Sequence, residues 1–374
     1  MKKRLGLTSL GKVGGWTGGV YYIRNMAYQL SCNKEILENY DIFVFIRNSH
    51  FVEFKDLPSE VKLIQVSEKF ANNKLICMLL YVLNRIDILF PMGKDLSKLN
   101  IQSIAWIPDF QHVYFPELFE KEECQQRTDL YTKFAKSNRK IVLSSNSAFD
   151  NFKSLCEIIN SKVEVVRFVS YIEPIIRDRL GCEEEVLNKF GLKNEKYVCV
   201  MNQFWQHKNH IVVLEAMRVY FANNPESDLL FVFTGKLEDY RNPEHIRKIV
   251  NYFEKEEIRN HSIRLGFLDR KDQIIIMKNS MFVIQPSLFE GWGTVVEDAK
   301  VLDKTILLSD ILVHREQMNS KCILFNPYDC NELANLIEKE SLVEHSDDIE
   351  NGIKDMHNRA LEYSKSFEKL LLEG

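Results

Sequence analysis

The segment 286–300 carries three acids in an arrangement that is typical of a ligand site. The preceding run, 281–285, is β-branched and aromatic in character and predicts a buried strand, and a glycine-punctuated loop with one acid, Glu290, follows it. This loop leads into a predicted helix with two more acids, Glu297 and Asp298, near its start. Open α/β sheets bind ligands at the carboxyl ends of their strands, so the loop is a candidate site.

Helix-capping rules distinguish the two helical acids. Thr294, followed three residues later by Glu297, predicts a capping box that occupies Glu297 with the backbone amide of Thr294. Asp298 is then available to accept from a ligand hydroxyl. The remaining amides of the first turn favour an anion such as phosphate. Gly291 and Gly293 allow the backbone to approach a ligand closely.

This segment resembles the signature of the family 4 (group 1) retaining glycosyltransferases of the GT-B fold, including bacterial polysaccharide and lipopolysaccharide enzymes. In that family an acid, seven intervening residues and a Glu bind the donor sugar and the ribose. The resemblance gives Glu290 the first place and, without a gap, Asp298 the second; a one-residue deletion would give Glu297 the second place instead. We prefer Asp298, because 299–307 then align without adjustment. The resemblance implies that Glu290 is catalytic, and that the donor-binding residues here are Glu290, Gly291, Trp292, Gly293, Thr294, Glu297 and Asp298.

A second segment of the same resemblance follows the predicted strand at 197–201. The family usually has an Arg and a Lys here that contact the donor diphosphate; Lys208 matches the Lys, whereas Gln203 stands in place of the Arg. The resemblance implies a catalytic, diphosphate-binding Lys208, with Asn202 and Gln203 also on the donor. His207 and His210 could substitute for the missing positive charge, but we favour a structural role for both.

In the first half, 106–116 resembles the family's His-Asp segment, which lines the cleft where acceptor and donor sugar meet. Pro108 occupies the usual His position and Asp109 is retained. Asp109 and His112, from the next turn, are therefore predicted catalytic residues. The alternative is that Asp109 only caps a turn after Pro108.

Three weaker segments complete the resemblance. The glycine-rich loop 14–19 lacks the spacing of a dinucleotide fingerprint, and it suits either phosphate binding or a plain turn before a helix that begins near Tyr21. The segments around residues 235 and 267 resemble family segments around the donor. His314 lies in another matching segment, but we leave it out of the site because a salt-bridged helix start explains it equally well. From these segments the resemblance implies five further donor-binding residues, Gly18, Gly19, Gly235, Phe267 and Leu268.

Length and composition favour two globular domains. A chain of 374 residues exceeds what one core usually supports. The net charge of -4 gives no reason to expect nucleic acid, and eight cysteines without a Cys-x-x-Cys pair fit a reducing cytoplasm. The start of the chain does not fit a signal peptide. The longest apolar run, 75–83, is too short to span a membrane, and we expect a core helix there in preference to a membrane-surface face.

Strands alternate with helices along the chain, which predicts an α/β protein with parallel, doubly wound sheets. With the resemblance, this gives a GT-B protein of two Rossmann-like domains facing across a cleft, 1–172 on the acceptor side and 173–345 on the nucleotide-sugar side, with a last helix in 346–374 that packs on the first domain. The predicted strands are 4–7, 42–46, 61–66, 103–107, 140–143, 163–166, 197–201, 229–233, 263–265, 281–285, 305–308 and 322–325. The predicted helices are 23–30, 74–83, 147–158, 210–220, 245–254, 271–278, 297–302 and 331–340.

The resemblance implies a retaining glycosyltransferase that moves a sugar from a nucleotide-diphosphate sugar to a saccharide or lipid-linked acceptor in cell-surface polysaccharide synthesis. We expect no cofactor and no metal, since an Asp-x-Asp signature is missing from the sequence. We expect a cytoplasmic location, with peripheral contact to the inner membrane as an option. Two alternatives remain open: a non-catalytic GT-B scaffold subunit, for which Gln203 and Pro108 would be the symptoms, and a GT-B sugar-nucleotide epimerase. The donor base and sugar, the acceptor and the oligomeric state do not follow from the sequence.

Overall fold

The computed structural model describes residues 2–11, 17–178, 183–239 and 241–372, which divide into two compact units. Unit 1 comprises Met1–Val113, Lys121–Tyr171 and Asp355–Gly374, and unit 2 comprises Tyr114–Glu120 and Ile172–Lys354. The chain therefore passes between the units at four points. The short excursion over Tyr114–Glu120 had no signal in the sequence.

Unit 1 contains a seven-stranded parallel sheet in the order β3-β2-β1-β4-β5-β6-β7. The order reverses direction between β1 and β4, as in doubly wound folds. All of its strands were predicted except β4, a short strand close behind an apolar helix. The strands are β1 (Lys3–Ser9), β2 (Tyr40–Arg47), β3 (Val61–Val66), β4 (Ile88–Phe90), β5 (Gln102–Ile107), β6 (Lys140–Leu143) and β7 (Lys162–Val165).

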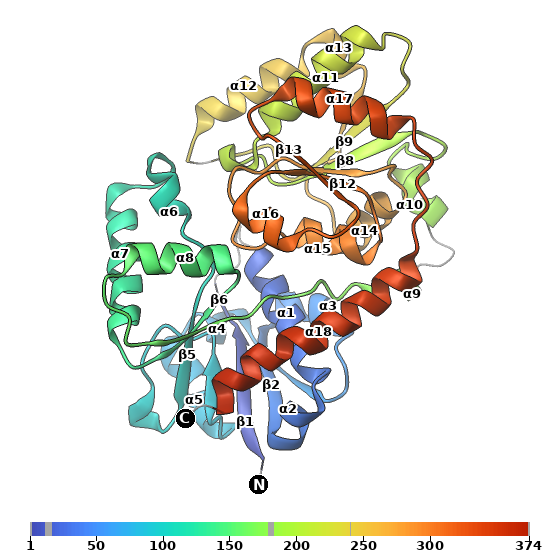
Figure 1. The fold of residues 1–374 in the computed structure, drawn as a ribbon. Helices are drawn as coiled ribbons and strands as arrows, with labels where there is room; N and C mark the ends of the chain where they lie inside the picture. Colours follow the sequence, from blue (N-terminus) through green and yellow to red (C-terminus); the bar gives the residue numbers. More distant parts are fainter. Residues whose placement is uncertain (1, 12–16, 179–182, 240, 373–374) are drawn as a thin grey trace. The chain divides into compact units, whose positions relative to one another are not determined.

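The helices of unit 1 connect these strands (Figure 1). The longest one that was not predicted, α7, is rich in polar residues, so its apolar periodicity is weak. The helices are α1 (Thr17–Ser31), α2 (Lys34–Asn39), α3 (Phe51–Phe54), α4 (Glu68–Ala71), α5 (Lys74–Leu83), α6 (Gln111–Tyr114), α7 (Lys121–Lys136) and α8 (Asn146–Leu155), with short 3-10 turns η1 (Asn48–His50) and η2 (Ser97–Leu99). A further 3-10 turn, η3 (Pro116–Leu118), lies in the segment Tyr114–Glu120 of unit 2.

Unit 2 contains a six-stranded parallel sheet in the order β10-β9-β8-β11-β12-β13. The direction reverses between β8 and β11, so the loops that follow these two strands lie at the switch point where doubly wound sheets bind ligands. All six strands were predicted. They are β8 (Tyr197–Met201), β9 (Leu230–Thr234), β10 (Ser262–Arg264), β11 (Val283–Gln285), β12 (Ile306–Ser309) and β13 (Cys322–Phe325).

Helices cover both faces of this second sheet (Figure 1). Helices α11, α12 and α17 lie on one face, and α14, α15 and α16 lie on the other. The helices of unit 2 are α9 (Glu173–Asp178), α10 (Glu183–Lys189), α11 (His210–Asn223), α12 (Pro243–Phe253), α13 (Glu256–Arg259), α14 (Arg270–Lys278), α15 (Thr294–Val301), α16 (Leu312–Gln317) and α17 (Cys330–Ser341), with the 3-10 turn η4 (Gln206–Lys208).

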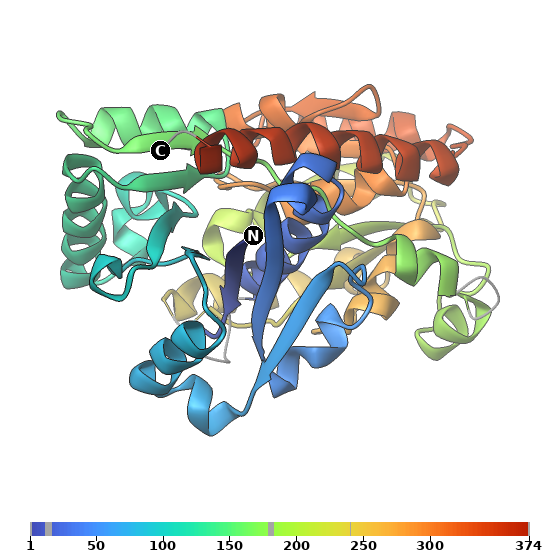
Figure 2. The ribbon, with the colours of Figure 1, turned by 90° about the horizontal axis from the view of Figure 1, so that it is seen from below.

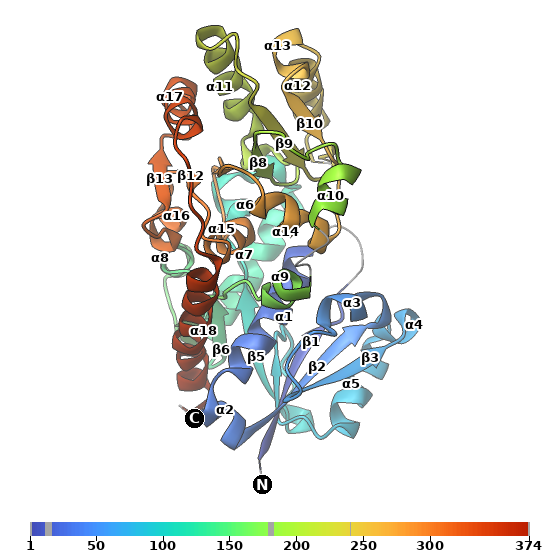
Figure 3. The same ribbon diagram turned by 90° about the vertical axis from the view of Figure 1, so that its right-hand side faces the viewer.

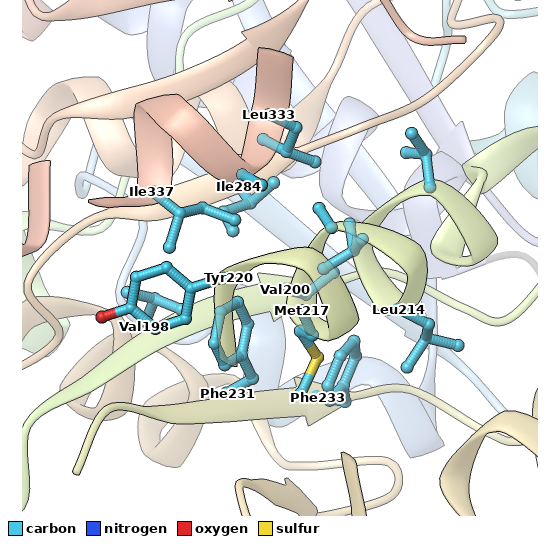
Figure 4. Packing of buried hydrophobic residues seen from close by; sticks show 14 of the residues in the cluster. Val198, Val200, Leu214, Met217, Tyr220, Phe231, Phe233, Ile284, Leu333 and Ile337 are labelled. Atoms are coloured by element: carbon cyan, nitrogen blue, oxygen red, sulfur yellow. The ribbon is translucent and has the colours of Figure 1, made fainter. Parts of the chain in front are cut away.

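The core between β8, β9, α11 and α17 fixes the switch-point strands (Figure 4). Val198 and Val200 of β8 and Phe231 of β9 are fully buried, and they pack against Met217 of α11 and Ile337 of α17. Burying such side chains contributes about 1.5–3 kcal/mol each. The strands whose ends carry the candidate site are therefore held in place by a tightly packed core.

The last helix, α18 (Ile349–Leu372), is the long helix in Figure 2. Its residues from 355 onward belong to unit 1. Phe367 packs edge-on against Phe90 at 5.3 Å, and Glu368 accepts a hydrogen bond of 2.9 Å from the side chain of Asn33. These contacts stabilise the end of the helix on the first sheet.

Helix α5 corrects one expectation. The run 75–83 is a helix as predicted, but only Cys77 and Tyr81 of α5 are buried, and several large apolar side chains face solvent. It is therefore only in part a core helix. Figure 3 shows α5 beside β3, the edge strand of the first sheet. Across the described ranges, no helix combines the length and hydropathy that a membrane span requires.

Candidate functional site

Glu290 lies in the loop after β11 with its carboxylate enclosed by donors. Its Oε1 accepts from Lys208 Nζ at 2.5 Å, Ser287 Oγ at 2.8 Å and Gln285 Nε2 at 3.0 Å. Only 10% of the side chain is exposed. Within the described chain no hydrogen bond reaches Oε2, so one oxygen is fixed and the other is available to a ligand hydroxyl.

The turn η4 after β8 brings Lys208 to Glu290. The next residue, Asn209, adopts a left-handed conformation with φ of 54°, and its side-chain amide donates to the carbonyl oxygens of Pro286 and Pro327 at 3.2 and 2.8 Å. The amide of Leu288 also donates to the carbonyl of His207 at 2.8 Å. Two loops that are 82 residues apart in sequence are thus held together by backbone and side-chain bonds.

The charges in this site favour the ionised form of Glu290. Burial alone would raise the pKa of its carboxyl group, but the ammonium of Lys208 and the hydrogen bonds from Lys208 and Ser287 outweigh burial and keep this pKa below its ordinary value. For His314 burial lowers the pKa to about 4, so its imidazole is neutral at pH ~7. Its Nδ1 lies 2.9 Å from the carbonyl oxygen of Ser309, and in the described chain its Nε2 has no hydrogen-bond partner.

A network of amide side chains continues from Glu290 into the sheet. Gln285, the last residue of β11, also exchanges hydrogen bonds with Asn202, the residue after β8, at 2.9 and 3.4 Å. Both side chains are buried. The predicted donor-binding residue Asn202 is therefore connected to Glu290 through Gln285, across the switch point of the sheet.

The predicted capping box at the start of α15 is wrong. The N-cap is Gly293, one residue earlier than expected, and no side chain of the N-cap residue itself caps the helix. The side chain of Gln317 bonds the N-cap residue in place of Glu297. Its Oε1 accepts from the Gly293 amide at 3.1 Å, and its Nε2 donates to the Gly293 carbonyl at 2.8 Å. Thr294 is thus the first helical residue, and Glu297 is one position too far along the helix for the box.

The two helical acids are both fully buried, each with a cation. Glu297 accepts from Lys300 and from Gln317, each at 3.0 Å. Asp298 was expected to be available to a ligand. Instead it forms a bidentate ion pair with Arg270 at the start of α14, in which Arg270 Nη1 lies 2.5 Å from Asp298 Oδ2. A contact between Asp298 and a ribose, as the resemblance implies, stays a prediction, and it has to be made with Arg270 in place.

Gln203 and Gly235 lie in the loops after β8 and β9, next to Asn202. Gln203 Oε1 accepts from the amide of Lys236 at 2.9 Å, which leaves its Nε2 to donate. Gly235 has φ of +108°, and a Cβ atom there would lie 2.3 Å from the backbone oxygen of Asn202, so the position requires glycine. Its amide donates to the carbonyl of Gly266 at 2.7 Å, which sets the loop before Phe267 and Leu268.

The two histidines considered as substitutes for the missing Arg are buried. Burial lowers the pKa of His210 to about 3, and its ring stacks on Phe204 at 4.2 Å. Burial also places the pKa of His207 well below its ordinary value. Both are neutral near pH ~7, so neither supplies the missing positive charge there.

The segment Tyr114–Glu120 reaches this loop region from outside the predicted domain. The ring of Phe289 lies 5.5 Å from Tyr114 and 6.3 Å from Phe115. The guanidinium of Arg241 lies over Phe119 at 5.4 Å and over Trp205 at 5.0 Å. The residue next to Glu290 thus has aromatic support from a distant part of the chain.

The predicted catalytic residues of unit 1, Asp109 and His112, lie near each other after β5. Asp109 caps a turn, since its Oδ1 accepts from the Gln111 amide at 3.0 Å, which matches the alternative stated for it. His112 is 2% exposed and packs against Tyr131 at 5.5 Å. Burial, with nearby Arg127, lowers its pKa. A catalytic role of either residue stays a prediction.

Gly18 and Gly19 lie in the first turn of α1, which begins at Thr17 instead of near Tyr21. The other residues of the glycine-rich loop, 14–16, lie outside the described residues. Sequence reasoning also missed side chains that complete the site. Two of them could have been found from the sequence, because Gln285 is a polar residue at the end of a buried strand and His314 lies in a segment that resembles the family. For Arg270 and Gln317 the sequence contains no indication of a role in the site. These residues are Arg270, Gln285, Ser287, His314 and Gln317.

Comparison with known structures supports the fold. Alr3699/HepE from Anabaena, solved with UDP and glucose, is 14% identical with a TM-score of 0.65, and 99% of each chain is covered. Sucrose-phosphate synthase from Thermosynechococcus elongatus is 12% identical with a TM-score of 0.63, with 100% of this chain and 97% of that chain covered. WaaG, a glycosyltransferase involved in lipopolysaccharide biosynthesis, is 11% identical with a TM-score of 0.63, with 99% and 100% covered.

In sequence, no curated protein matches the chain significantly. Residues 183–354 match the family model for glycosyl transferases group 1. This match includes the loops that carry Lys208 and Glu290. The chain thus has the GT-B fold, two parallel-sheet α/β domains, and its second unit carries a domain that matches glycosyl transferases group 1.

Proposed function

We propose that the chain is a retaining, metal-independent glycosyltransferase of family 4 that moves a sugar from a nucleotide-diphosphate sugar to a saccharide or lipid-linked acceptor, in polysaccharide synthesis. The observation that carries the proposal is the Lys208–Glu290 pair at the switch point of the second sheet. A fixed carboxylate with one available oxygen suits a sugar hydroxyl. An ammonium group beside it suits the diphosphate of the same donor.

The proposed chemistry follows from these positions. The bond between sugar C1 and the phosphate oxygen breaks, and its electron pair stays on the departing diphosphate. Lys208 and the first-turn amides of α15 stabilise the charge that develops there. The acceptor oxygen bonds to C1 on the face that the phosphate leaves, and its proton passes to a diphosphate oxygen. Lys208 has further N–H groups beyond the one that it donates to Glu290, so the same ammonium can contact both groups.

The uridine nucleotides are the first donors to test. Structures similar to this one were solved with UDP, with UDP-glucose or with UDP-2-fluoro glucose. A thermal-shift comparison of UDP, GDP, ADP and dTDP identifies the base, because a ligand that binds only the folded chain raises its stability, by about 2.7 kcal/mol at a hundred times Kd.

The decisive test is turnover with the donor sugar that this comparison selects. We expect slow release of the nucleoside diphosphate without acceptor and faster release with one, unaffected by EDTA. NMR of the product is expected to show the anomeric configuration of the donor. An inverted product would contradict the retaining mechanism, and donor binding without release of diphosphate in any condition would favour a scaffold.

A further inference from the structure

Helix α5 presents an apolar stripe to solvent. The exposed fractions of Leu75, Leu79, Val82 and Leu83 are 76%, 55%, 45% and 67%. At about 100° per residue these four side chains fall within an arc of about 100° on one side of the helix. Single exposed apolar residues are ordinary, but a continuous stripe of large ones marks an interaction surface.

Rotation of α5 cannot bury this stripe, because the opposite side is already fixed. Tyr81 packs edge-on against Phe45 at 4.9 Å, and its hydroxyl lies 2.9 Å from that of Thr8 in β1. Cys77, one turn earlier, belongs to the same buried cluster. The helix therefore has an inner apolar face for the sheet and an outer apolar face that is largely exposed.

The charges beside the stripe are mainly basic. Lys69, Lys74 and Arg85 lie in or next to α4 and α5, and the flanking acids are Glu68, which pairs with Arg47 at 2.8 Å, and Asp87, which accepts from the Arg4 amide at 2.7 Å. All three are exposed, and none has an ion-pair partner in the described part of the chain. Phe70, 49% exposed, extends the apolar surface into α4. Apolar residues with basic ones beside them are the composition of helices that lie on anionic membranes.

We propose that Phe70, Leu75, Leu79, Val82 and Leu83, here named the α5 surface, dock on an anionic lipid bilayer. With ten residues α5 is about 15 Å long, too short to span a bilayer, so it would lie in the plane of the interface. A second copy of the chain fits the α5 surface less well, because a symmetric contact through α5 would bring like charges together.

This inference does not depend on sugar transfer. None of the residues of the α5 surface takes part in the network around Glu290, and membrane binding is measured without donor or acceptor. The vesicle experiment and the turnover experiment can therefore fail separately. If both succeed, the α5 surface holds the enzyme where a lipid-linked acceptor is found.

The test is flotation of the full chain with vesicles of phosphatidylcholine alone or with one third phosphatidylglycerol. We expect binding to the anionic vesicles only, and weaker binding as salt is added. The variant Leu75→Ser/Leu79→Ser/Leu83→Ser is expected to bind at least about tenfold more weakly, and Lys69→Gln/Lys74→Gln about fivefold more weakly per lysine. These positions are exposed, so unchanged circular dichroism and Tm are expected.

The matched control is Leu342→Ser/Leu361→Ser, which removes exposed leucines from other surfaces and is expected to bind like the wild type. The proposal is overturned if the wild-type chain ignores anionic vesicles, or if the leucine variant still binds them. It is also overturned if light scattering shows that the wild type forms a dimer that the leucine variant loses, with no vesicle binding.

Discussion

Glu290 in unit 2 and Asp109 in unit 1 both follow the end of a parallel strand, yet their surroundings differ. Three side-chain donors, one of them an ammonium, converge on one oxygen of Glu290. Asp109 accepts a backbone amide two residues ahead in the chain. The first carboxylate is held by hydrogen bonds from residues distant in sequence, whereas the hydrogen bond of the second is local and only its charge reaches Arg127 and Tyr131 of α7.

This difference shows what turns an acid at a strand end into a candidate catalytic group. Position at the carboxyl edge is shared by both residues, so position alone does not decide. Enclosure distinguishes them, because a carboxylate that is fixed and kept charged has one oxygen oriented for a ligand. The substitutions that follow test whether function depends on this enclosure.

The largest contrast is expected between Glu290→Gln and Asp109→Asn. The first should lower kcat/KM by about 2–4 kcal/mol of transition-state stabilisation, because a neutral amide cannot replace the charged acceptor. The second keeps an acceptor oxygen for the Gln111 amide, and we expect a loss of at most about tenfold. Kinetics of donor turnover measure both. Equal losses would remove the distinction between the two acids.

Asp298→Asn sharpens the comparison within unit 2. It leaves the guanidinium of Arg270 without its carboxylate, so we expect the free energy of unfolding to fall by about 3 kcal/mol in urea titrations. Arg270→Gln should destabilise the chain similarly but keep the carboxylate. If Asp298 also accepts from the ribose, only Asp298→Asn raises the donor Kd, by about tenfold. A donor defect in Glu297→Gln instead would support the one-residue-deletion alignment.

His314 gives a pH test of the enclosure. Its pKa is about 4 in the folded chain and about 6.5 when unfolded, so between these values the unfolded chain binds a proton that the folded chain does not. Stability is then lost as the pH falls through this window, by about 2 kcal/mol between pH ~7 and ~5. His314→Gln should lose that part of the pH dependence. Titration of the His314 ring near its ordinary pKa, followed by NMR, would contradict the burial described here.

The smallest effect is expected for Lys208→Ala on binding. The lost charge should weaken UDP by about tenfold, with uridine unaffected, because the ammonium meets phosphate and not base. Calorimetry of both ligands measures the difference, and Lys208→Arg is the control that keeps the charge. Equal weakening of UDP and uridine would show that Lys208 acts on the loop and not on the diphosphate.

Most of the fold could be predicted because strands and helices alternate with clear periodicity. The exceptions have physical reasons, since β4 is three residues long and α7 is rich in polar residues. In the site, the sequence predicted Glu290 and Lys208 as members, but not that they pair. The partners of Asp298 and Gly293 are Arg270 in α14 and Gln317 in α16. Contacts between side chains so far apart in the sequence leave no local sequence pattern.

The four crossings between units have a practical consequence for anyone who cuts the chain. A fragment with the matched residues 183–354 alone would lack Tyr114–Glu120. Phe289 would lose two aromatic neighbours, and Arg241 would lose the ring of Phe119. We expect that aromatic rings exposed in this way, beside the loops that carry Lys208 and Glu290, would promote aggregation during expression. A soluble half-protein for ligand screening therefore requires 114–120 to be supplied, for example by fusion through a flexible linker.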